Sequence, residues 1–211
     1  EGALARDRAH AHLLATAGRL SPGLERHIAG TGPIWFPRRR TTDLALYLCR
    51  SVVGQQLSGA AARSIWARLE AALGCRGPAL PNRCRPAALA RIRASGVSGA
   101  KARALIGIRD ASRSGLLDEA LAATERAGRD ARLKEIWGVG QWTCDMVSIF
   151  FCKDPDVWPL GDTSVQRAFR IFVGEQVGDD RHERFAPWRS ILTLHLYRYL
   201  DDPAPVDAQP R

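Results

Sequence analysis

Apolar residues recur along most of the chain three or four positions apart, which is the spacing of one face of an α-helix. No segment shows the strict alternation that predicts a half-buried strand. We therefore predict an all-α fold. The predicted helices span Leu44–Val53, Ala60–Leu73, Pro86–Ala94, Ala100–Ser112, Leu116–Ala123, Ala131–Ile136, Trp142–Phe151, Thr163–Phe172 and Trp188–Leu200.

Residues that start and stop helices support several of these boundaries. Ser58 and Ser98 each precede a periodic run and can accept a hydrogen bond from its first turn, and Gly74 can end a helix. The proline-containing stretch Gly74–Pro86 is predicted to be a loop, and Asp201–Arg211 a frayed tail.

A glycine-containing hairpin lies between two of the predicted helices. In Ile136–Thr143, Gly138 and Gly140 permit backbone conformations that other residues avoid, and the next helix begins at once. Without side chains on these glycines a phosphate can approach the backbone, and the N–H groups that open a helix attract an anion. Such a grip does not depend on base sequence. The alternative is an ordinary helix connection, since Gly-x-Gly alone is a weak signal.

A lone carboxylate, Asp162, ends the sequence Trp158-Pro159-Leu160-Gly161-Asp162. An aspartate in front of the amphipathic run that begins at Thr163 is well suited to cap a helix N-terminus, and capping alone would explain it. A helix N-terminus also favours a charged carboxylate, so a chemical role and a capping role are compatible.

Taken in order along the chain, these features resemble the helix-hairpin-helix (HhH-GPD) superfamily of DNA glycosylases, and specifically its 3-methyladenine DNA glycosylase II branch, which removes alkylated bases. Trp137 stands where that family usually has proline, Gln141 where it has proline or arginine, and Cys144 where it has alanine. These departures concern the detail of the hairpin. The resemblance covers most of the chain and rests on the segments Ser51–Ser58, Gly96–Ala102, Ile136–Thr143, Trp158–Asp162 and Pro187–Ser190.

The resemblance implies two helical lobes with DNA bound across the cleft between them. Residues 42–148 would form the central lobe, which ends in the helix-hairpin-helix, and residues 1–41 with 149–211 would form the second lobe, which carries the aspartate loop. The residues before Thr42 are too few for the additional sheet domain of some relatives, so we expect the compact form.

The resemblance also assigns the chemistry to Asp162. Cleavage of a base from deoxyribose builds positive charge on the sugar, and a nearby carboxylate can stabilise that charge and orient or deprotonate the attacking water. One aspartate suffices because an alkylated purine is already cationic. Bifunctional relatives carry a lysine where this chain has Trp142, so we expect a monofunctional enzyme. Lys101 and Lys134 are expected to contact phosphates or remain solvated.

Base removal requires the damaged nucleotide to leave the stack. By resemblance, Gln56, with Gln55 or Leu57 assisting, would fill the gap that is left in the duplex. Helix-end capping or polar packing is the alternative role for the two glutamines.

An aromatic slot would hold the extruded base, and its candidates are Trp142, Trp35 and Trp188, because a methylated purine stacks well on an indole. For Trp35 and Trp188 a core position is equally open. Trp66 and Trp137 are expected to pack rather than bind.

The resemblance places the phosphate contacts of the hairpin at Gly138, Val139, Gly140, Gln141 and Thr143. Hairpins of this family often hold a monovalent cation with backbone carbonyls. The matching carbonyls belong to Lys134, Ile136 and Val139.

Composition agrees with a polyanionic partner. The formal net charge is +9, and the run Arg38-Arg39-Arg40 contributes locally, so we expect salt-sensitive binding to double-stranded DNA. No apolar run is long enough to cross a bilayer and no signal-peptide pattern is visible, which favours a soluble, cytoplasmic protein. By resemblance we expect it to associate with the nucleoid, and to be a monomer because a monomer suits an enzyme that scans DNA by sliding.

Cysteines and histidines show no cofactor pattern. The chain has 5 cysteines without a Cys-x-x-Cys pair, so we expect neither an iron-sulfur cluster nor a disulfide framework. The 5 histidines lack metal-ligand spacing, and we expect His10 and His12 to be solvated.

Three functions remain open from the sequence. The first is excision of alkylated purines such as 3-methyladenine and 7-methylguanine. The second is a glycosylase of the same fold for oxidised, deaminated or mismatched bases, and the third is a module that binds DNA or a lesion without cutting. Asp162 in its motif argues against the third, and Trp142 together with the cysteine pattern favours the first.

Overall fold

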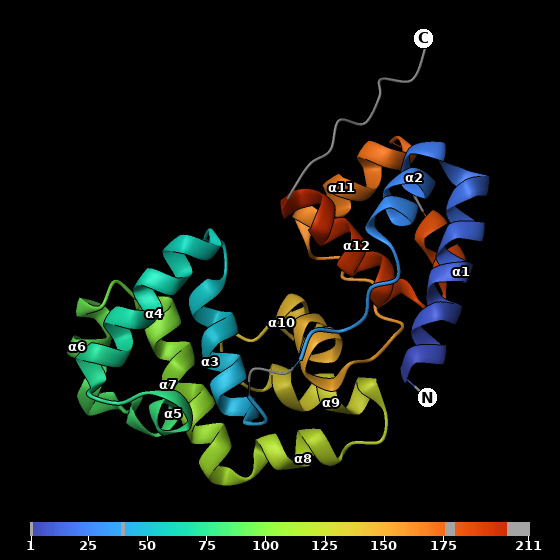
Figure 1. Ribbon diagram of the computed structural model, residues 1–211. Helices are drawn as coiled ribbons and strands as arrows, with labels where there is room; N and C mark the ends of the chain where they lie inside the picture. The colour runs from blue at the N-terminus through green and yellow to red at the C-terminus, as the bar shows by residue number, and fades with distance from the viewer. Residues whose placement is uncertain (1, 39–40, 176–179, 202–211) are drawn as a thin grey trace. The chain divides into compact units, whose positions relative to one another are not determined.

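The computed structural model describes residues 2–38, 41–175 and 180–201, and these residues contain helices and no strand (Figure 1). The predicted all-α fold is confirmed. Arg39, Arg40 and the tail after Asp201 lie outside the described residues. The α-helices are α1 (Gly2–Leu20), α2 (Pro22–Thr31), α3 (Leu44–Gly54), α4 (Gly59–Leu73), α5 (Leu80–Arg83), α6 (Leu89–Ala94), α7 (Gly99–Ser114), α8 (Leu116–Ala122), α9 (Arg126–Lys134), α10 (Gln141–Met146), α11 (Thr163–Val173) and α12 (Arg189–Asp201).

The chain divides into two compact units. Unit 1 consists of residues 1–38 and 152–211, and unit 2 of residues 39–151. From the sequence, the divisions were expected after residues 41 and 148. Each unit is described by itself below.

Unit 1 packs α2 against α1, α11 and α12, and the N-terminal helices lie beside α12 in Figure 1. Its core buries Leu13 of α1, Leu24 and Ile28 of α2, and Leu192 of α12 completely. Helix α2 begins where Ser21 Oγ accepts a hydrogen bond from the Leu24 amide at 3.3 Å.

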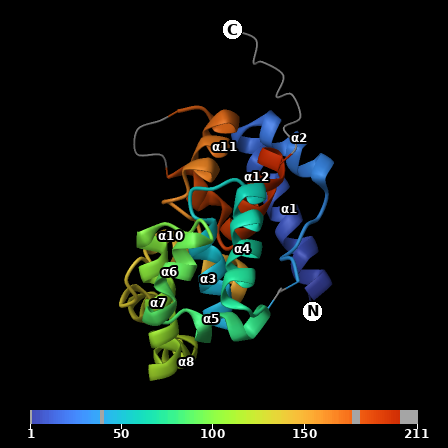
Figure 2. The same cartoon turned by 90° about the vertical axis from the view of Figure 1, so that its left-hand side faces the viewer.

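Unit 2 is built around α3, which packs against α4, α5, α7 and α10 (Figure 2). The predicted caps are present: Ser58 accepts from the Ala61 amide, Ser98 accepts from the Lys101 amide, and Gly74 ends α4 in the left-handed conformation. These local interactions explain why the boundaries of α4 and α7 could be predicted closely.

Three details of unit 2 differ from the prediction. The segment Gly74–Pro86 is not only a loop, because it contains α5, whose Leu80 and Pro81 are buried; a proline is tolerated in the first turn of a helix, where its missing N–H is not needed. Helix α9 begins at Arg126 rather than Ala131, in a stretch too polar to show periodicity. The helix that starts with α10 continues as π-helix over Val147–Cys152.

No helix among the described residues is both long enough and apolar enough to span a membrane.

Candidate active site

Asp162 caps α11 in unit 1. Its side chain is buried, with 7% of the residue exposed. The Oδ1 atom accepts hydrogen bonds from the backbone N–H groups of Ser164 at 3.1 Å and Val165 at 3.0 Å. The capping role considered from the sequence is therefore present, and it uses one carboxylate oxygen.

The second oxygen of Asp162 has its own partner. The hydroxyl of Tyr197 on α12 donates to Oδ2 at 2.6 Å, which is a charge-assisted hydrogen bond. Sequence reasoning missed Tyr197. The available signal was its helical spacing from Ser190 of the Pro187–Ser190 segment, which places both residues on one face of α12.

The start of the aspartate loop is also attached to α12. Ser190 Oγ accepts from the Val157 amide at 2.9 Å, and the Ser190 amide donates to the Pro155 carbonyl at 3.0 Å. The Arg189 guanidinium forms a bidentate pair with Asp156 at 2.7 and 2.9 Å, and this hydrogen bonding raises the pKa of Arg189. Helix α12 thus holds both ends of the loop from Pro155 to Asp162.

Two of the three candidate pocket tryptophans are neighbours. The rings of Trp35 and Trp188 lie 6.0 Å apart between centroids, and both residues are half-buried in unit 1. Trp142, also half-buried, lies on α10 of unit 2.

The two tryptophans expected to pack behave differently. Trp66 is buried and donates to Glu70 at 2.8 Å, as the prediction requires. For Trp137 the prediction was wrong: 45% of the residue is exposed, and the Arg103 guanidinium lies 4.4 Å from its ring centroid. A residue at the tip of a hairpin has few neighbours to pack against.

The hairpin glycines are not equivalent. Gly138 has φ +84°, and a Cβ placed there would lie 2.9 Å from the Ala104 Cβ, so this position needs glycine. Gly140 has φ −103°, which any residue can adopt, and a Cβ there would meet nothing within 4 Å. The expectation of a special conformation is wrong for Gly140, where the glycine provides open space instead.

The backbone of the hairpin is partly engaged in its own turn. The Val139 amide donates to the Ile136 carbonyl at 3.0 Å, so this N–H serves the turn. The Ile136 carbonyl fits a cation only through its remaining lone pair. A phosphate contact at Thr143 would use the backbone, because that side chain is 1% exposed and accepts from Gln55 at 3.1 Å.

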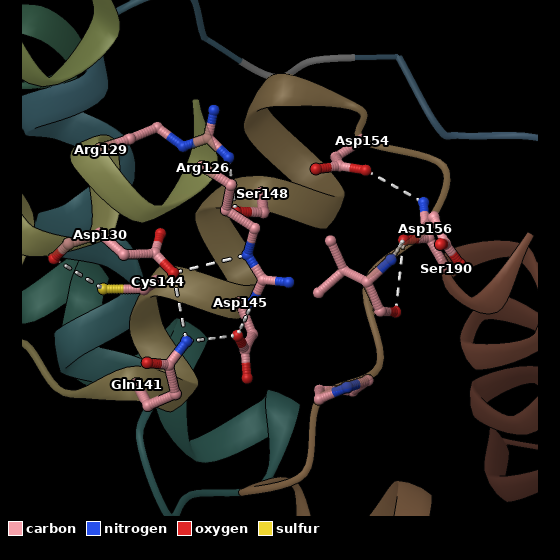
Figure 3. A network of polar contacts seen from close by, with 12 residues as sticks. Arg126, Arg129, Asp130, Gln141, Cys144, Asp145, Ser148, Asp154, Asp156 and Ser190 are labelled. Atoms are coloured by element: carbon pink, nitrogen blue, oxygen red, sulfur yellow. Dashed lines mark hydrogen bonds and ion pairs between the residues drawn. The ribbon is translucent and has the colours of Figure 1, made fainter. Parts of the chain in front are cut away.

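A buried polar network joins the two helices of the hairpin (Figure 3). The side-chain amide of Gln141 donates to Asp145 at 2.8 Å and to Asp130 at 3.2 Å. Arg126 donates to Asp145 and lies 3.4 Å from Asp130. Burial raises the pKa of Asp145, whose side chain is 2% exposed. The Gln141 side chain therefore connects α9 and α10.

The predicted duplex-filling residues form the turn between α3 and α4. We call Gln55–Leu57 the wedge loop. Gln56 is exposed with φ +56°, and Leu57 is 39% exposed. Lys101 does not remain solvated as predicted: its ammonium donates to the carbonyls of Val53 at 2.9 Å and Gln55 at 2.8 Å.

Metal-binding groups are not assembled in the described part of the chain: no group of three or more His, Cys, Asp or Glu side chains there could hold a metal ion. None of the five cysteines forms a disulfide bond. The expectation of solvated histidines is wrong for His10, which is half-buried and stacks on His195, and for His12, which is half-buried and lies 3.3 Å from the Arg184 carbonyl.

Comparison with curated proteins finds related sequences, although no family model matches the chain. The chain is 32% identical over 159 residues to DNA-3-methyladenine glycosylase 1 of Schizosaccharomyces pombe, covering 72% of this chain and 70% of that protein. It is 30% identical over 184 residues to a probable bifunctional transcriptional activator/DNA repair enzyme AlkA of Mycobacterium tuberculosis, covering 78% of this chain but only 35% of that protein.

Solved structures extend the similarity. The 3-methyladenine DNA glycosylase Mag1 of Schizosaccharomyces pombe, in complex with abasic DNA, matches with a TM-score of 0.78 and 25% identity over 96% of this chain and 100% of that one. A DNA-3-methyladenine glycosidase from Bacillus halodurans matches with a TM-score of 0.67 and 27% identity, covering 86% of this chain and 85% of that one. The similarity therefore includes residues of both units.

Proposed function

Because the chain belongs to the DNA-3-methyladenine glycosylase family, we propose that it excises alkylated purines from double-stranded DNA and leaves an abasic site for base excision repair. Its substrates are bases of the 3-methyladenine and 7-methylguanine type. It acts as a monomer, and in a bacterial-type cell it is located in the cytoplasm and associates with the nucleoid.

The observation that carries the mechanism is the fixed carboxylate of Asp162. Its Oδ1 is bound by two amides and its Oδ2 by Tyr197, so the anion is held in one orientation. As the base leaves with the bonding electrons, positive charge develops on the deoxyribose, and a preoriented anion stabilises it without reorganising. The same oxygen Oδ2 can orient the water that attacks the sugar or accept its proton.

We propose hydrolysis without a lyase step. In bifunctional relatives a lysine amine attacks the sugar, and the indole of Trp142 at that position offers no nucleophile. Lys101, the lysine of the Gly96–Ala102 segment, already donates hydrogen bonds to two carbonyls. Water is therefore the attacking group.

The hairpin supplies the grip on DNA. Gly138 shapes the turn and Gly140 leaves open space beside the backbone, so a phosphate can approach the peptide N–H groups at the start of α10. Since the Val139 amide is used inside the turn, the contacts would come from Gly140 onward. A monovalent cation, if held, would be bound by the carbonyls of Lys134, Ile136 and Val139.

The extruded base would be held by stacking. Trp35 and Trp188 already lie together, and a cationic purine is attracted to the face of an indole. By resemblance, Trp142 would also stack against an extruded base. Gln56 would fill the gap in the duplex, with Gln55 and Leu57 beside it.

The test is Asp162→Asn in a base-release assay. Asparagine caps a helix about as well as aspartate, so the fold is retained while the negative charge is lost. With methylated duplex DNA, we expect the wild type to release free methylpurines and leave alkali-labile sites, and Asp162→Asn to be about 10²–10⁴-fold slower.

Asp118→Asn, at an exposed position on α8, is the matched control and should keep full activity. Strand nicking without alkali would contradict the monofunctional assignment. Release of only oxidised or mismatched bases would show that alkylated purines are not the substrate class. DNA binding without any base release would indicate a binding module.

A further inference from the structure

The wedge loop is held in a conformation that its sequence does not favour. Gln56 has φ +56°, in the left-handed region that is strained for a residue with a side chain. Gln56 and Leu57 are both exposed, so packing of these side chains does not supply the compensation. Other groups must hold the loop.

Lys101 of α7 holds the loop at its first residue. Its ammonium bonds the Val53 carbonyl at 2.9 Å and the Gln55 carbonyl at 2.8 Å. The Gln55 carbonyl belongs to the peptide unit that precedes Gln56, so fixing its direction restricts φ of Gln56. Both carbonyls lie at the C-terminal end of α3, where unpaired acceptors and the helix dipole favour a cation.

The cation is partly removed from water. Lys101 is half-buried, and burial lowers its pKa. Hydrogen bonds from a charged donor are stronger than neutral ones, and more so where solvent is excluded. The Lys101 side chain therefore connects α7 to the wedge loop through strong hydrogen bonds.

A second connection links the same loop to the hairpin. The Gln55 side-chain amide donates to Thr143 Oγ1 at 3.1 Å, and Thr143 is buried on α10. The Leu57 amide donates to the Gly54 carbonyl at 3.2 Å and closes the turn. The loop is thus bound from α7 on one side and from the second helix of the hairpin on the other.

We propose that Lys101 is a positioning residue that sets the wedge loop in its inserting conformation before DNA is bound, so that base extrusion depends on it. The inference deepens the proposed function and rests on it. A loop that is already ordered adds no ordering cost when it fills the gap in the duplex. Lys101 itself acts through the Gln55 peptide and touches neither the base nor the sugar.

The experiment compares wild type with Lys101→Met, which keeps the length of the side chain and removes the donor. Single-turnover excision of 7-methylguanine is measured in a fully paired duplex and opposite a mismatched base, where extrusion is easier. We expect Lys101→Met to slow excision from the paired duplex at least ~10-fold, from the loss of charge-assisted hydrogen bonds, and to slow the mismatched substrate clearly less. Lys101→Arg, which retains a donor, should restore part of the loss.

A purely structural role would reduce both rates by one factor, and that result overturns the proposal, as does an unchanged rate on paired DNA. Thr143→Val removes the other connection and gives the same comparison, with a milder selective loss expected, should Lys101→Met fail to fold. If wild-type protein releases 7-methylguanine from neither duplex, the proposed function itself fails. Release by wild type with no selective loss in the variants refutes only the role of Lys101.

Discussion

Asp162 in unit 1 and the hairpin with the wedge loop in unit 2 are both held by buried polar contacts, but the contacts are arranged differently. Asp162 is itself the hydrogen-bonded residue, since its two oxygens cap α11 and accept from Tyr197. In unit 2 the exposed turns are held by neighbours such as Asp145 and Lys101, which lie behind them. In the proposed mechanism, structural and chemical roles are therefore combined in one side chain in unit 1 and divided among several in unit 2.

The difference decides which substitutions are informative. A change at Asp162 alters both the cap and the chemistry unless the replacement keeps the cap, as asparagine does. In unit 2, a change behind a turn leaves the surface of the turn in place and alters only how firmly it is held.

The largest expected loss of stability comes from Arg126→Met, which leaves Asp145 buried without its cation. We expect the free energy of unfolding to fall by about 3 kcal/mol, the lower end of the range for a broken buried pair, because the Arg126 side chain is 33% exposed. Urea unfolding measures it. Arg132→Met, whose partner Glu135 is 52% exposed, is the control and should change stability by less than about 1 kcal/mol. Equal losses for both variants would show that the network does not hold unit 2.

The next effect separates the two hairpin glycines. Gly138→Ala introduces a side chain at φ +84° and a contact of 2.9 Å with Ala104, so we expect a loss of about 2 kcal/mol in stability and weaker DNA binding. Gly140→Ala meets open space at an ordinary φ and should leave stability nearly unchanged. Thermal unfolding and DNA affinity of the two variants provide the comparison, and similar stability losses would contradict the assigned geometry.

Much of this architecture could be predicted from local sequence, because helix caps act within a few residues of themselves. Ser58, Ser98, Gly74 and Asp162 all do in the structure what their positions in the sequence suggested. Short helices without periodicity, such as α5 with Pro81 in its first turn, gave no such signal.

The contacts of the site residues were harder to predict than the helix caps, because they join groups far apart in sequence. Nothing near Asp162 identifies Tyr197, and nothing near Gln55 identifies Lys101 or Thr143. By resemblance Gln141 was predicted to contact a phosphate, and the sequence did not indicate that its side-chain amide also donates to Asp130 on the preceding helix. Such pairings depend on how helices pack.

A smaller effect tests the combination of roles in unit 1. Tyr197→Phe removes the donor to Oδ2 while both amide bonds to Oδ1 remain, so α11 should keep its cap. We expect excision to slow roughly 10-fold, as for the loss of one hydrogen bond to a charged group, with a change in thermal stability of under about 1 kcal/mol. A rate equal to wild type would show that the amides alone orient the carboxylate. Tyr199→Phe, on the same helix, is the matched control.

The smallest expected effect is a loss of folding stability as the pH falls. His195 in unit 1 is completely buried, and its ring nitrogens form no hydrogen bond with any residue that the structure describes. Burial together with the nearby His27 and His10 lowers its pKa to about 3. A histidine with a lowered folded-state pKa contributes stability above its unfolded pKa, near 6.5, and loses it progressively as the pH falls from there toward 3. Between pH 6.5 and 5.5 we therefore expect the free energy of unfolding to fall by about 1 kcal/mol through this group.

Urea unfolding at these two pH values measures the change, and His195→Leu, which cannot take up a proton, should lose less stability over the same interval. An identical pH dependence in the variant would show that other groups cause the loss of stability at low pH. A reduced dependence would show that unit 1 buries an ionisable group without a hydrogen-bond partner among the described residues, in contrast to the paired Asp145 of unit 2.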